Sequence, residues 1–353
     1  MILNRAEFLS QLEAVSPGLS PKEHTEQSSC FAFKKGMVIT FNDEIACRIA
    51  TGVNGMEGVV KAEPLLRVLG KMTEDEIKVE VDEEEDKFVI WGQDDRKRVR
   101  ILLESEINMP LDKIEKPGEW KKLPEDFTEA ITIVKECAAA KSEFFDLTCV
   151  HIHPKWIEAF DNDQMTRYYL KTKVGKSVLV RRESIKHIVT MDMTEFSESK
   201  TWVHFRNPTG LILSCRRFSD EFRDLSQNFK DLAGDKAGLP KKLIAAAERA
   251  EIFSAENKDN NKLMVELKPG DPGWVRITSV GATGDYREVR KIKYRGRKLA
   301  FFIAPKLLIE LAKRHNECLV SPTALKVDGG KWVYLTSLEV DDANGKTQGD
   351  DGG

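Results

Sequence analysis

Two pairs of side chains in the middle of the chain could bind a metal ion. His151 and His153 stand two residues apart in a strand-like stretch, so both imidazoles would project to one face. Asp161 and Asp163 could share a divalent cation, although a hairpin turn uses the same residue types. No third ligand is evident beside the histidines, and for the two aspartates the hairpin turn is the favoured interpretation. A metal-dependent nuclease using Asp161, Asp163 and His151 remains the enzymatic alternative.

Other catalytic motifs are absent or incomplete in the sequence. Gly175-Lys176-Ser177 matches the end of a phosphate-binding loop, but Leu170 stands where that loop needs its first glycine. A strand turn is therefore favoured at this position. The chain has no nucleophile elbow, zinc-protease helix or Gly-rich dinucleotide turn. We expect a non-catalytic protein without a cofactor or a bound metal.

The composition indicates a globular protein of two or three domains. The chain has 353 residues, 41% of them hydrophobic, and a formal net charge of −3. It lacks the run of about 18 apolar residues that a membrane-spanning helix needs, and residues 1–13 lack the apolar core of a signal peptide. Six scattered cysteines without a Cys-x-x-Cys pair predict reduced, buried thiols in a cytoplasmic protein that makes no membrane contact.

The same order of elements occurs three times along the chain, and it begins with a helix and a hairpin. Apolar residues at helical spacing predict the opening helices, and short β-branched and aromatic runs around a turn predict the hairpins. The helices are expected within residues 3–15, 123–134 and 239–253, and the hairpins within residues 30–40, 148–159 and 263–277.

Each repeat then continues with a second helix and a closing hairpin. The second helices are expected at residues 62–72, 182–191 and 305–315, and the closing hairpins at residues 77–91, 202–214 and 319–335. The predicted fold is therefore α+β, with three repeated α/β domains that each pack two helices on antiparallel sheets. The expected domains span residues 1–118, 119–234 and 235–340. A Gly- and Asp-rich tail, residues 341–353, is expected to be disordered.

Basic residues concentrate on the second helices of an otherwise acidic chain. They are Lys61, Arg67 and Lys71 in the first repeat, Arg181, Arg182 and Lys186 in the second, and Lys306, Lys313 and Arg314 in the third, with Lys241 and Lys242 opening the third repeat. If these helices face a common axis, they make a positive hole. Duplex DNA in that hole would be held through its phosphates without base readout, and binding would weaken with salt. The alternative is that each helix only exposes a solvated polar face.

Several stretches resemble the bacterial DNA polymerase III beta-type sliding clamp family. Residues 242–254 resemble the opening helix of that family's third domain, residues 275–279 and 288–294 resemble the strand pair after it, and residues 39–43 resemble a strand and acidic turn of its first domain. The resemblance covers nearly the whole chain apart from the tail. It implies the DNA clamp fold, in which each three-domain subunit forms half of a ring.

The resemblance also implies a function. Two subunits close head to tail into a homodimeric ring, through edge strands of the first and third domains, and the ring encircles double-stranded DNA. Such a clamp does no chemistry: it is a processivity factor that holds a DNA polymerase on DNA and needs a clamp loader. The alternative that stays open is a clamp-fold interaction protein that does not encircle DNA.

Individual residues can be carried over from the family where the sequences match. The resemblance implies DNA contacts from Lys22, from Lys141, from Arg182, and from Phe144 and Phe145, which replace a Tyr pair. It also implies a pocket for partner peptides between the second and third domains, with Leu170, Thr172, Leu307 and Leu338 as candidates. The turn at residues 161–167 and the end at residues 336–338 depart from the family pattern. That divergence is typical of a phage or prophage clamp.

Overall fold

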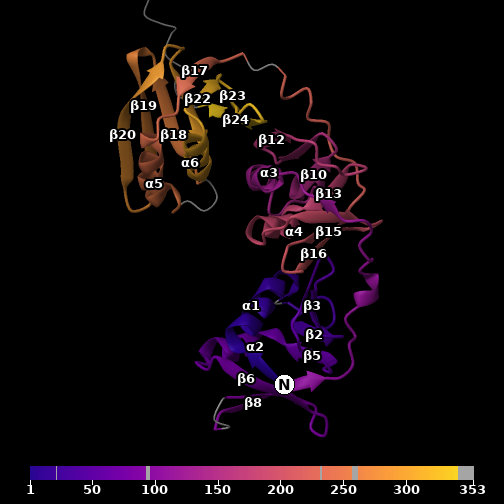
Figure 1. The fold of residues 1–353 in the computed structure, drawn as a ribbon. Coiled ribbons are helices and arrows are strands. Elements are labelled where there is room, and N and C mark those ends of the chain that lie inside the picture. The colour runs from indigo at the N-terminus through magenta and orange to yellow at the C-terminus, as the bar shows by residue number, and fades with distance from the viewer. Residues whose placement is uncertain (21, 93–95, 231–232, 257–260, 341–353) are drawn as a thin grey trace, which may run out of the picture. The chain divides into compact units, whose positions relative to one another are not determined.

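The computed structural model describes residues 1–20, 22–92, 96–230, 233–256 and 261–340, and within them six α-helices lie on two large antiparallel sheets (Figure 1). The predicted α+β fold class is therefore confirmed. The chain forms two compact units. The first comprises residues 1–157 and 170–222, and the second comprises residues 158–169 and the described residues from 223 onward. The expected domain boundaries near 118, 234 and 340 stay predictions, and the predicted disordered tail lies outside the described residues.

One sheet of the first unit is continuous across the first and second repeats. Its strand order is β1-β6-β7-β8-β5-β2-β3-β4-β16-β15-β14-β9, with antiparallel neighbours throughout. The strands are β1 (Ile2–Asn4), β2 (Cys30–Lys34), β3 (Met37–Phe41), β4 (Ile45–Ala50), β5 (Gly58–Lys61), β6 (Glu76–Asp82), β7 (Lys87–Trp91), β8 (Arg98–Glu104), β9 (Lys121–Lys122), β14 (Glu195–Glu198), β15 (Trp202–Arg206) and β16 (Ile212–Arg216). The join is made by β4 and β16, where Arg48 pairs with Ile212.

The first unit also holds α1 (Arg5–Val15), α2 (Ala62–Lys71), α3 (Phe127–Val134), α4 (Arg182–Ile185), β10 (Cys149–His153) and β13 (Val178–Arg181), while β11 (Trp156–Phe160) divides between the units. Helix α1 illustrates why the predicted helices form. The Asn4 side chain accepts a hydrogen bond from the Glu7 amide at 2.9 Å and caps the first turn. Phe8, Leu12 and Val15 recur on one face and are buried.

The second unit carries its own antiparallel strands and two helices. Its strand order is β12-β24-β23-β22-β17-β20-β19-β18-β21-β25. The elements are β12 (Gln164–Tyr169), β17 (Asp235–Gly238), α5 (Lys242–Ser254), β18 (Leu263–Lys268), β19 (Gly270–Val280), β20 (Asp285–Tyr294), β21 (Leu299–Ile303), α6 (Pro305–Arg314), β22 (Glu317–Val320), β23 (Ala324–Asp328), β24 (Trp332–Ser337) and β25 (Glu339–Val340). Helices α5 and α6 lie side by side (Figure 1).

The predicted second helix of the middle repeat, residues 182–191, is only partly correct. The α-helix ends at Ile185, and a 3-10 helix, η5 (Lys186–Thr190), continues the chain. Three successive β-branched residues, Ile188, Val189 and Thr190, explain the early end, because such side chains crowd the preceding helical turn.

Two predicted features of the third repeat are also corrected. In the closing hairpin predicted at residues 319–335, the first arm, residues 319–327, is expected as one strand but forms two, β22 and β23, because a turn intervenes. In that turn the Ser321 amide donates to the Ala324 carbonyl at 2.8 Å, and the Ser321 hydroxyl accepts a bond from the Ala324 amide at 3.0 Å. In the hairpin predicted within residues 263–277, the segment 269–273 between the two arms falls largely inside β19, whose pairing with β20 is irregular between Gly270 and Gly273.

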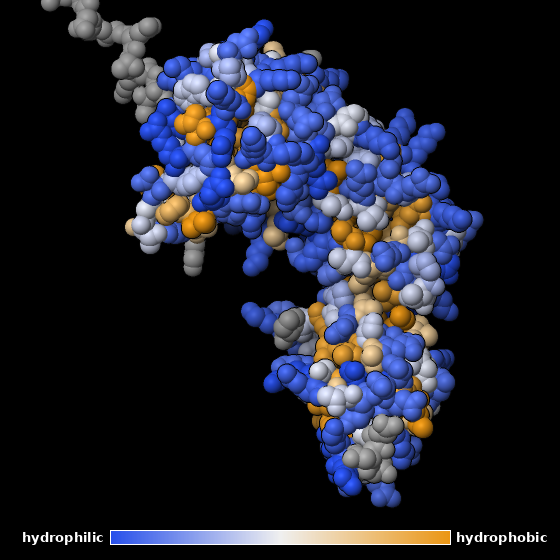
Figure 2. Space-filling view, turned by 60° about the vertical axis from the view of Figure 1, so that its left-hand side comes forward, coloured by the Kyte–Doolittle hydropathy of each residue, from blue (hydrophilic) through white to orange (hydrophobic). Residues whose placement is uncertain are grey.

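The cysteines and the surface agree with the predicted globular character. All six cysteines are buried and free, and burial raises the pKa of Cys47 and Cys318 to about 12. Figure 2 shows that hydrophilic side chains cover most of the visible surface, with apolar residues in small separate patches. Within the described residues, the helices are too short or too polar to cross a membrane.

A neutral histidine is built into the first unit. The His204 side chain is fully buried on β15, with Nδ1 at 2.8 Å from the Ser214 hydroxyl and Nε2 at 3.2 Å from the Ser199 hydroxyl. Burial, assisted by the positive charge of Arg48, lowers the pKa of His204 to about 4. The folded ring therefore stays uncharged through most of the mildly acidic range.

This burial predicts a loss of stability in mild acid. The unfolded imidazole, with a pKa of about 6.5, gains a proton as the pH falls, and the folded ring resists protonation until about pH 4. Between about pH 7 and about pH 5 the free energy of unfolding of the first unit should fall by about 2 kcal/mol from this residue. Urea unfolding followed by tryptophan fluorescence measures it. His204→Gln should remove this part of the pH dependence, and an equal loss in the variant would refute the assignment.

Candidate nucleic-acid interface

The cations of α2 form the most exposed basic group of the first repeat. Arg67 is paired with Glu63 one turn earlier at 3.5 Å, and both side chains are about 80% exposed. Together with Lys71, which has no ion pair among the described residues, they border a shallow surface hollow. Lys61, at the start of the helix, is held by Glu23 at 3.1 Å. Arg67 and Lys71 are thus the cations on this helix most available to a phosphate.

The cations around α4 are bound into the protein more firmly. Arg182 donates to the Ala138 carbonyl at 2.8 Å and lies 3.5 Å from Glu136. Arg181 lies 3.3 Å from Glu44. Lys186 bonds to Glu183, and this bond lowers the pKa of the Glu183 carboxyl. A phosphate would have to compete with these carboxylates, so this group offers less net attraction than its residue types suggest.

The third group lies on α5 and α6 in the second unit. Lys313 and Arg314 share Glu310, at 3.0 Å and 3.3 Å, and Lys241 donates to backbone carbonyls at the end of α6, including that of Ala312 at 2.9 Å. Lys242 and Lys306 are exposed, and neither has an ion pair among the described residues. As on α2, some cations of this group have no compensating carboxylate among the described residues.

The remaining DNA-contact candidates lie in loops of the first unit. Lys22 and Lys141 are exposed, and the Phe144 side chain is 65% exposed. Phe145 instead packs against Phe218, with ring centroids 4.7 Å apart, and under the Arg181 guanidinium at 4.9 Å. Phe144 could stack on a ligand, whereas Phe145 anchors its loop. All the predicted DNA contacts remain predictions.

The four candidates for the peptide pocket differ in exposure. Leu170 in the first unit and Leu307 on α6 are half-buried, and Leu338 after β24 is 7% exposed. Thr172 is fully buried, and its hydroxyl donates to the His153 carbonyl at 2.8 Å. A peptide could touch Leu170 and Leu307 directly, while Thr172 would act only by shaping its surroundings. The pocket itself stays a prediction.

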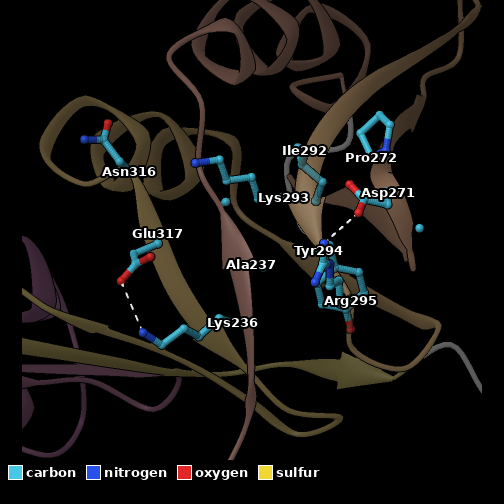
Figure 3. Close-up of a pocket in the computed structure, with 12 residues that line it drawn as sticks. Lys236, Ala237, Asp271, Pro272, Ile292, Lys293, Tyr294, Arg295, Asn316 and Glu317 are labelled. Carbon is cyan, nitrogen blue, oxygen red and sulfur yellow. Dashed lines mark hydrogen bonds and ion pairs between the residues drawn. The ribbon is translucent and has the colours of Figure 1, made fainter.

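The structure contains a groove in the second unit that the sequence analysis missed. It has a volume of about 550 Å³ and lies where β17 leaves β20, beside the first residues of β19. Figure 3 shows Lys236 paired with Glu317 across one side, at 3.7 Å, and Arg295 paired with Asp271 on the other, at 2.6 Å. Lys293 also lines it and has no ion pair among the described residues. No local sequence signal marks this groove, because residues far apart in the chain build it.

The side chains that could do chemistry have structural roles. The His153 ring stacks on Trp156 at 3.6 Å, and the His151 ring packs against Phe222 at 4.5 Å. The Asp161 carboxylate accepts hydrogen bonds from the Asp163 and Gln164 amides, both at 2.9 Å, which is the hairpin-turn interpretation. No group of three metal-ligating side chains occurs in the described part of the chain.

The glycine-lysine-serine motif does not have the setting of a phosphate-binding loop. Gly175 and Lys176 form a bend, and the strand β13 follows from Val178, where a phosphate-binding loop would begin a helix. The Gly175 amide donates a hydrogen bond to the Glu198 carboxylate at 3.1 Å, so this amide already has an acceptor in the place of a phosphate. The strand-turn interpretation of this motif is confirmed.

Known proteins resemble this chain in structure much more than in sequence. No protein-family model and no curated protein matches the sequence. A putative DNA polymerase III beta subunit from Eubacterium rectale is 17% identical with a TM-score of 0.77, and the match covers 96% of this chain and 98% of that one. The DNA polymerase III beta chain from Streptococcus pneumoniae is 15% identical with a TM-score of 0.78, and the match covers 96% and 99%. A DNA polymerase sliding clamp from Pseudomonas aeruginosa is 14% identical with a TM-score of 0.75, and the match covers 96% and 99%.

At such low identity the likeness shows the fold, and it extends over nearly all of each chain. The order of helices and antiparallel strands is the one expected from the sequence. The chain therefore has the fold of the bacterial DNA polymerase III beta subunits, as its sequence predicted.

Proposed function

We propose that this protein is a sliding clamp, in which two copies close a ring around duplex DNA and tether a DNA polymerase. The observation that carries the proposal is the likeness to DNA polymerase III beta subunits over 96% of the chain, with a TM-score of 0.78 to one of them. A clamp acts without catalysis, in agreement with the structural roles of His151, His153, Asp161 and Asp163. A phage or prophage origin stays a prediction.

Two exposed basic helices support the DNA-binding part of the proposal. Arg67 and Lys71 on α2, and Lys306 on α6, present charge to solvent from corresponding helices of the first and third repeats. Cations that meet phosphates without reading bases suit a protein that must move along any sequence. The net charge of −3 would keep other surfaces from binding DNA indiscriminately.

Two open strand edges support ring closure. Residues 98–102 of β8 pair with β7 on one edge, and among the described strands nothing pairs with their other edge. β20 pairs with β19 on one edge, and its other edge meets a described strand only at Tyr294. Open edges are templates for another strand. Leu102 and Val289, on these strands, are 53% and 49% exposed.

A charge at either open edge should break the ring. Leu102→Asp or Val289→Asp should raise the dimer dissociation constant by roughly a thousandfold. Removing one buried apolar side chain costs about 2 kcal/mol, and a two-subunit ring contains each interface twice. Mass measurement by light scattering over a dilution series reports the dissociation constant. Phe144→Asp, on an exposed loop outside both edges, is the matched control and should stay dimeric.

Reversing the exposed helix cations should weaken DNA binding. Arg67→Glu, Lys71→Glu and Lys306→Glu, combined, should lower the affinity for duplex DNA at least tenfold at low salt. The slope of log affinity against log salt should fall by about one for each phosphate that the protein no longer neutralises. Fluorescence anisotropy with a labelled duplex measures both quantities.

The control for this variant is Lys34→Glu combined with Lys155→Glu, which reverses exposed lysines in two hairpins. It should leave the affinity nearly unchanged. Equal reductions in affinity for the two variants would mean that net charge alone governs binding, and the helix assignment would be wrong.

One observation favours the alternative of a clamp-fold interaction protein that does not close on itself. Both open edges carry basic residues: Arg98 on β8, beside an Arg100 that Asp82 and Glu85 compensate, and Arg287 and Lys291 on β20. Like charges oppose pairing at low salt. A monomer at every concentration and salt level would favour this alternative over the ring.

We also propose that the polymerase and a clamp loader bind through short apolar peptides. Leu170 and Leu307 have exposed surface for such contacts, whereas Thr172 and Leu338 are buried. A clamp would work in the cytoplasm, where the six buried thiols stay reduced.

A further inference from the structure

One face of the sheet in the second unit is unusually basic. Residues alternate between the two faces of a strand, and on β20 Tyr286 and Glu288 point toward Arg249 of α5. The opposite face therefore carries the β20 residues that alternate with these two, together with the residues that pair with them on the neighbouring strands. This basic sheet face comprises the cations Lys268, Arg276, Arg287, Lys291 and Lys293, the Trp274 ring, and two carboxylates, Glu266 and Asp285.

Four of these cations have no carboxylate partner within the described residues. Arg276 is paired with Glu266 at 2.6 Å. Lys268, Arg287, Lys291 and Lys293 are exposed, and no ion pair to another described residue holds them. Lys268 lies over the Trp274 ring at 5.5 Å, and Lys291 is directly opposite Trp274 on the neighbouring strand. Unlike the cations around α4, these are available to bind an anionic group.

The groove at the end of this face contributes Lys293 to this set. Figure 3 shows that Lys236 and Arg295 are each joined to a carboxylate, while Lys293 is joined to neither pair. The unbalanced charge is therefore concentrated on the strands β18 and β20.

The chain leaves the described structure near the same end of this sheet. β25 pairs with β21 in the order Phe302↔Glu339, then Phe301↔Val340, so it advances toward Leu299. Leu299 pairs with Leu267, and the next residue of β18, Lys268, pairs with Trp274. The chain thus heads from β25 toward the end of the sheet where Lys268, Lys291 and Lys293 lie.

The residues that follow have the complementary charge. Residues 341–353 contain Asp341, Asp342, Asp350 and Asp351 against one cation, Lys346. From β25 to β20 is four strand spacings, or about 19 Å. The nine residues from Asp342 to Asp351 can span up to about 30 Å, so Asp350 and Asp351 can reach the free cations.

We propose that residues 341–353 bind in cis to the basic sheet face. Exposed ion pairs are individually weak, but tethering raises the effective concentration of the segment at this face to the millimolar range. The bound aspartates occupy the positions that nucleic-acid phosphates would otherwise take. The segment therefore screens this face from non-specific nucleic acid. The proposal does not depend on ring formation or on the proposed clamp function.

Zero-length carbodiimide cross-linking of the full chain tests this binding directly. At low salt, peptide mapping by mass spectrometry should find Asp350 and Asp351 joined to Lys268, Lys291 or Lys293, and about 0.5 M NaCl should abolish these links because salt screens exposed charges. Mixing isotopically labelled and unlabelled chains should show links within one chain. Links mainly to other lysines, links only between chains, or no links at any salt would overturn the proposal.

A binding measurement tests the consequence. A chain shortened after residue 340, and a full chain with the four aspartates changed to asparagine, should each bind a labelled single-stranded oligonucleotide at least threefold more tightly than the full chain. In the shortened chain, Lys268→Glu, Lys291→Glu and Lys293→Glu together should remove that gain, while Lys34→Glu with Lys155→Glu should keep it. No gain on shortening, or a gain that survives the sheet-face changes, would refute the screening role.

Discussion

Backbone pairing between antiparallel strands is the interaction on which the other features of this protein depend. Each second helix begins directly after a sheet strand: α2 follows β5, α4 follows β13, and α6 follows β21 after one residue. The end of the strand therefore fixes where Lys61, Arg181 and Lys306 lie, and the apolar side of each helix must then face the sheet. The same pairing leaves β8 and β20 with open edges. Ring closure would therefore add strand pairing at edges whose backbone groups are already arranged for it.

Charge compensation decides which cations can act. A basic residue held by a nearby carboxylate, as Lys61 is by Glu23 and Arg182 by Glu136, gives up that pair before it binds a phosphate. We therefore propose as the functional charges the uncompensated cations on α2, α6 and the basic sheet face, with Arg67, whose only ion pair among the described residues is highly exposed. Two of these groups are proposed to meet DNA, and the third to be covered by the acidic residues after β25. A net charge of −3 is compatible with the proposed DNA binding because the positive charge is local.

Local patterns predicted much of the fold, whereas long-range pairing could not be predicted. Helical spacing located α1 and α5, and short β-branched and aromatic runs located the hairpins, one of which turns at Lys35 and Gly36, both at positive φ. No local spacing of residues predicts the contacts between distant segments. These contacts include the β4–β16 and β12–β24 pairings, the buried Glu158–Arg167 ion pair at 2.6 Å and the groove beside β17. Glu63–Arg67 and Glu310–Arg314 were visible as i,i+4 pairs, so part of the compensation of the basic helices was predictable.

Encirclement of DNA is a topological property, and retention of the protein on closed against open DNA tests it most directly. The protein would be mixed with nicked circular DNA at a concentration where it is monomeric, concentrated so that rings close, and separated from free protein at about 0.3 M salt, where phosphate contacts are weak. The account predicts that protein stays with the circles and is released when one restriction cut linearises them. Equal retention before and after the cut, or no retention on circles by a protein that is dimeric under these conditions, would contradict encirclement.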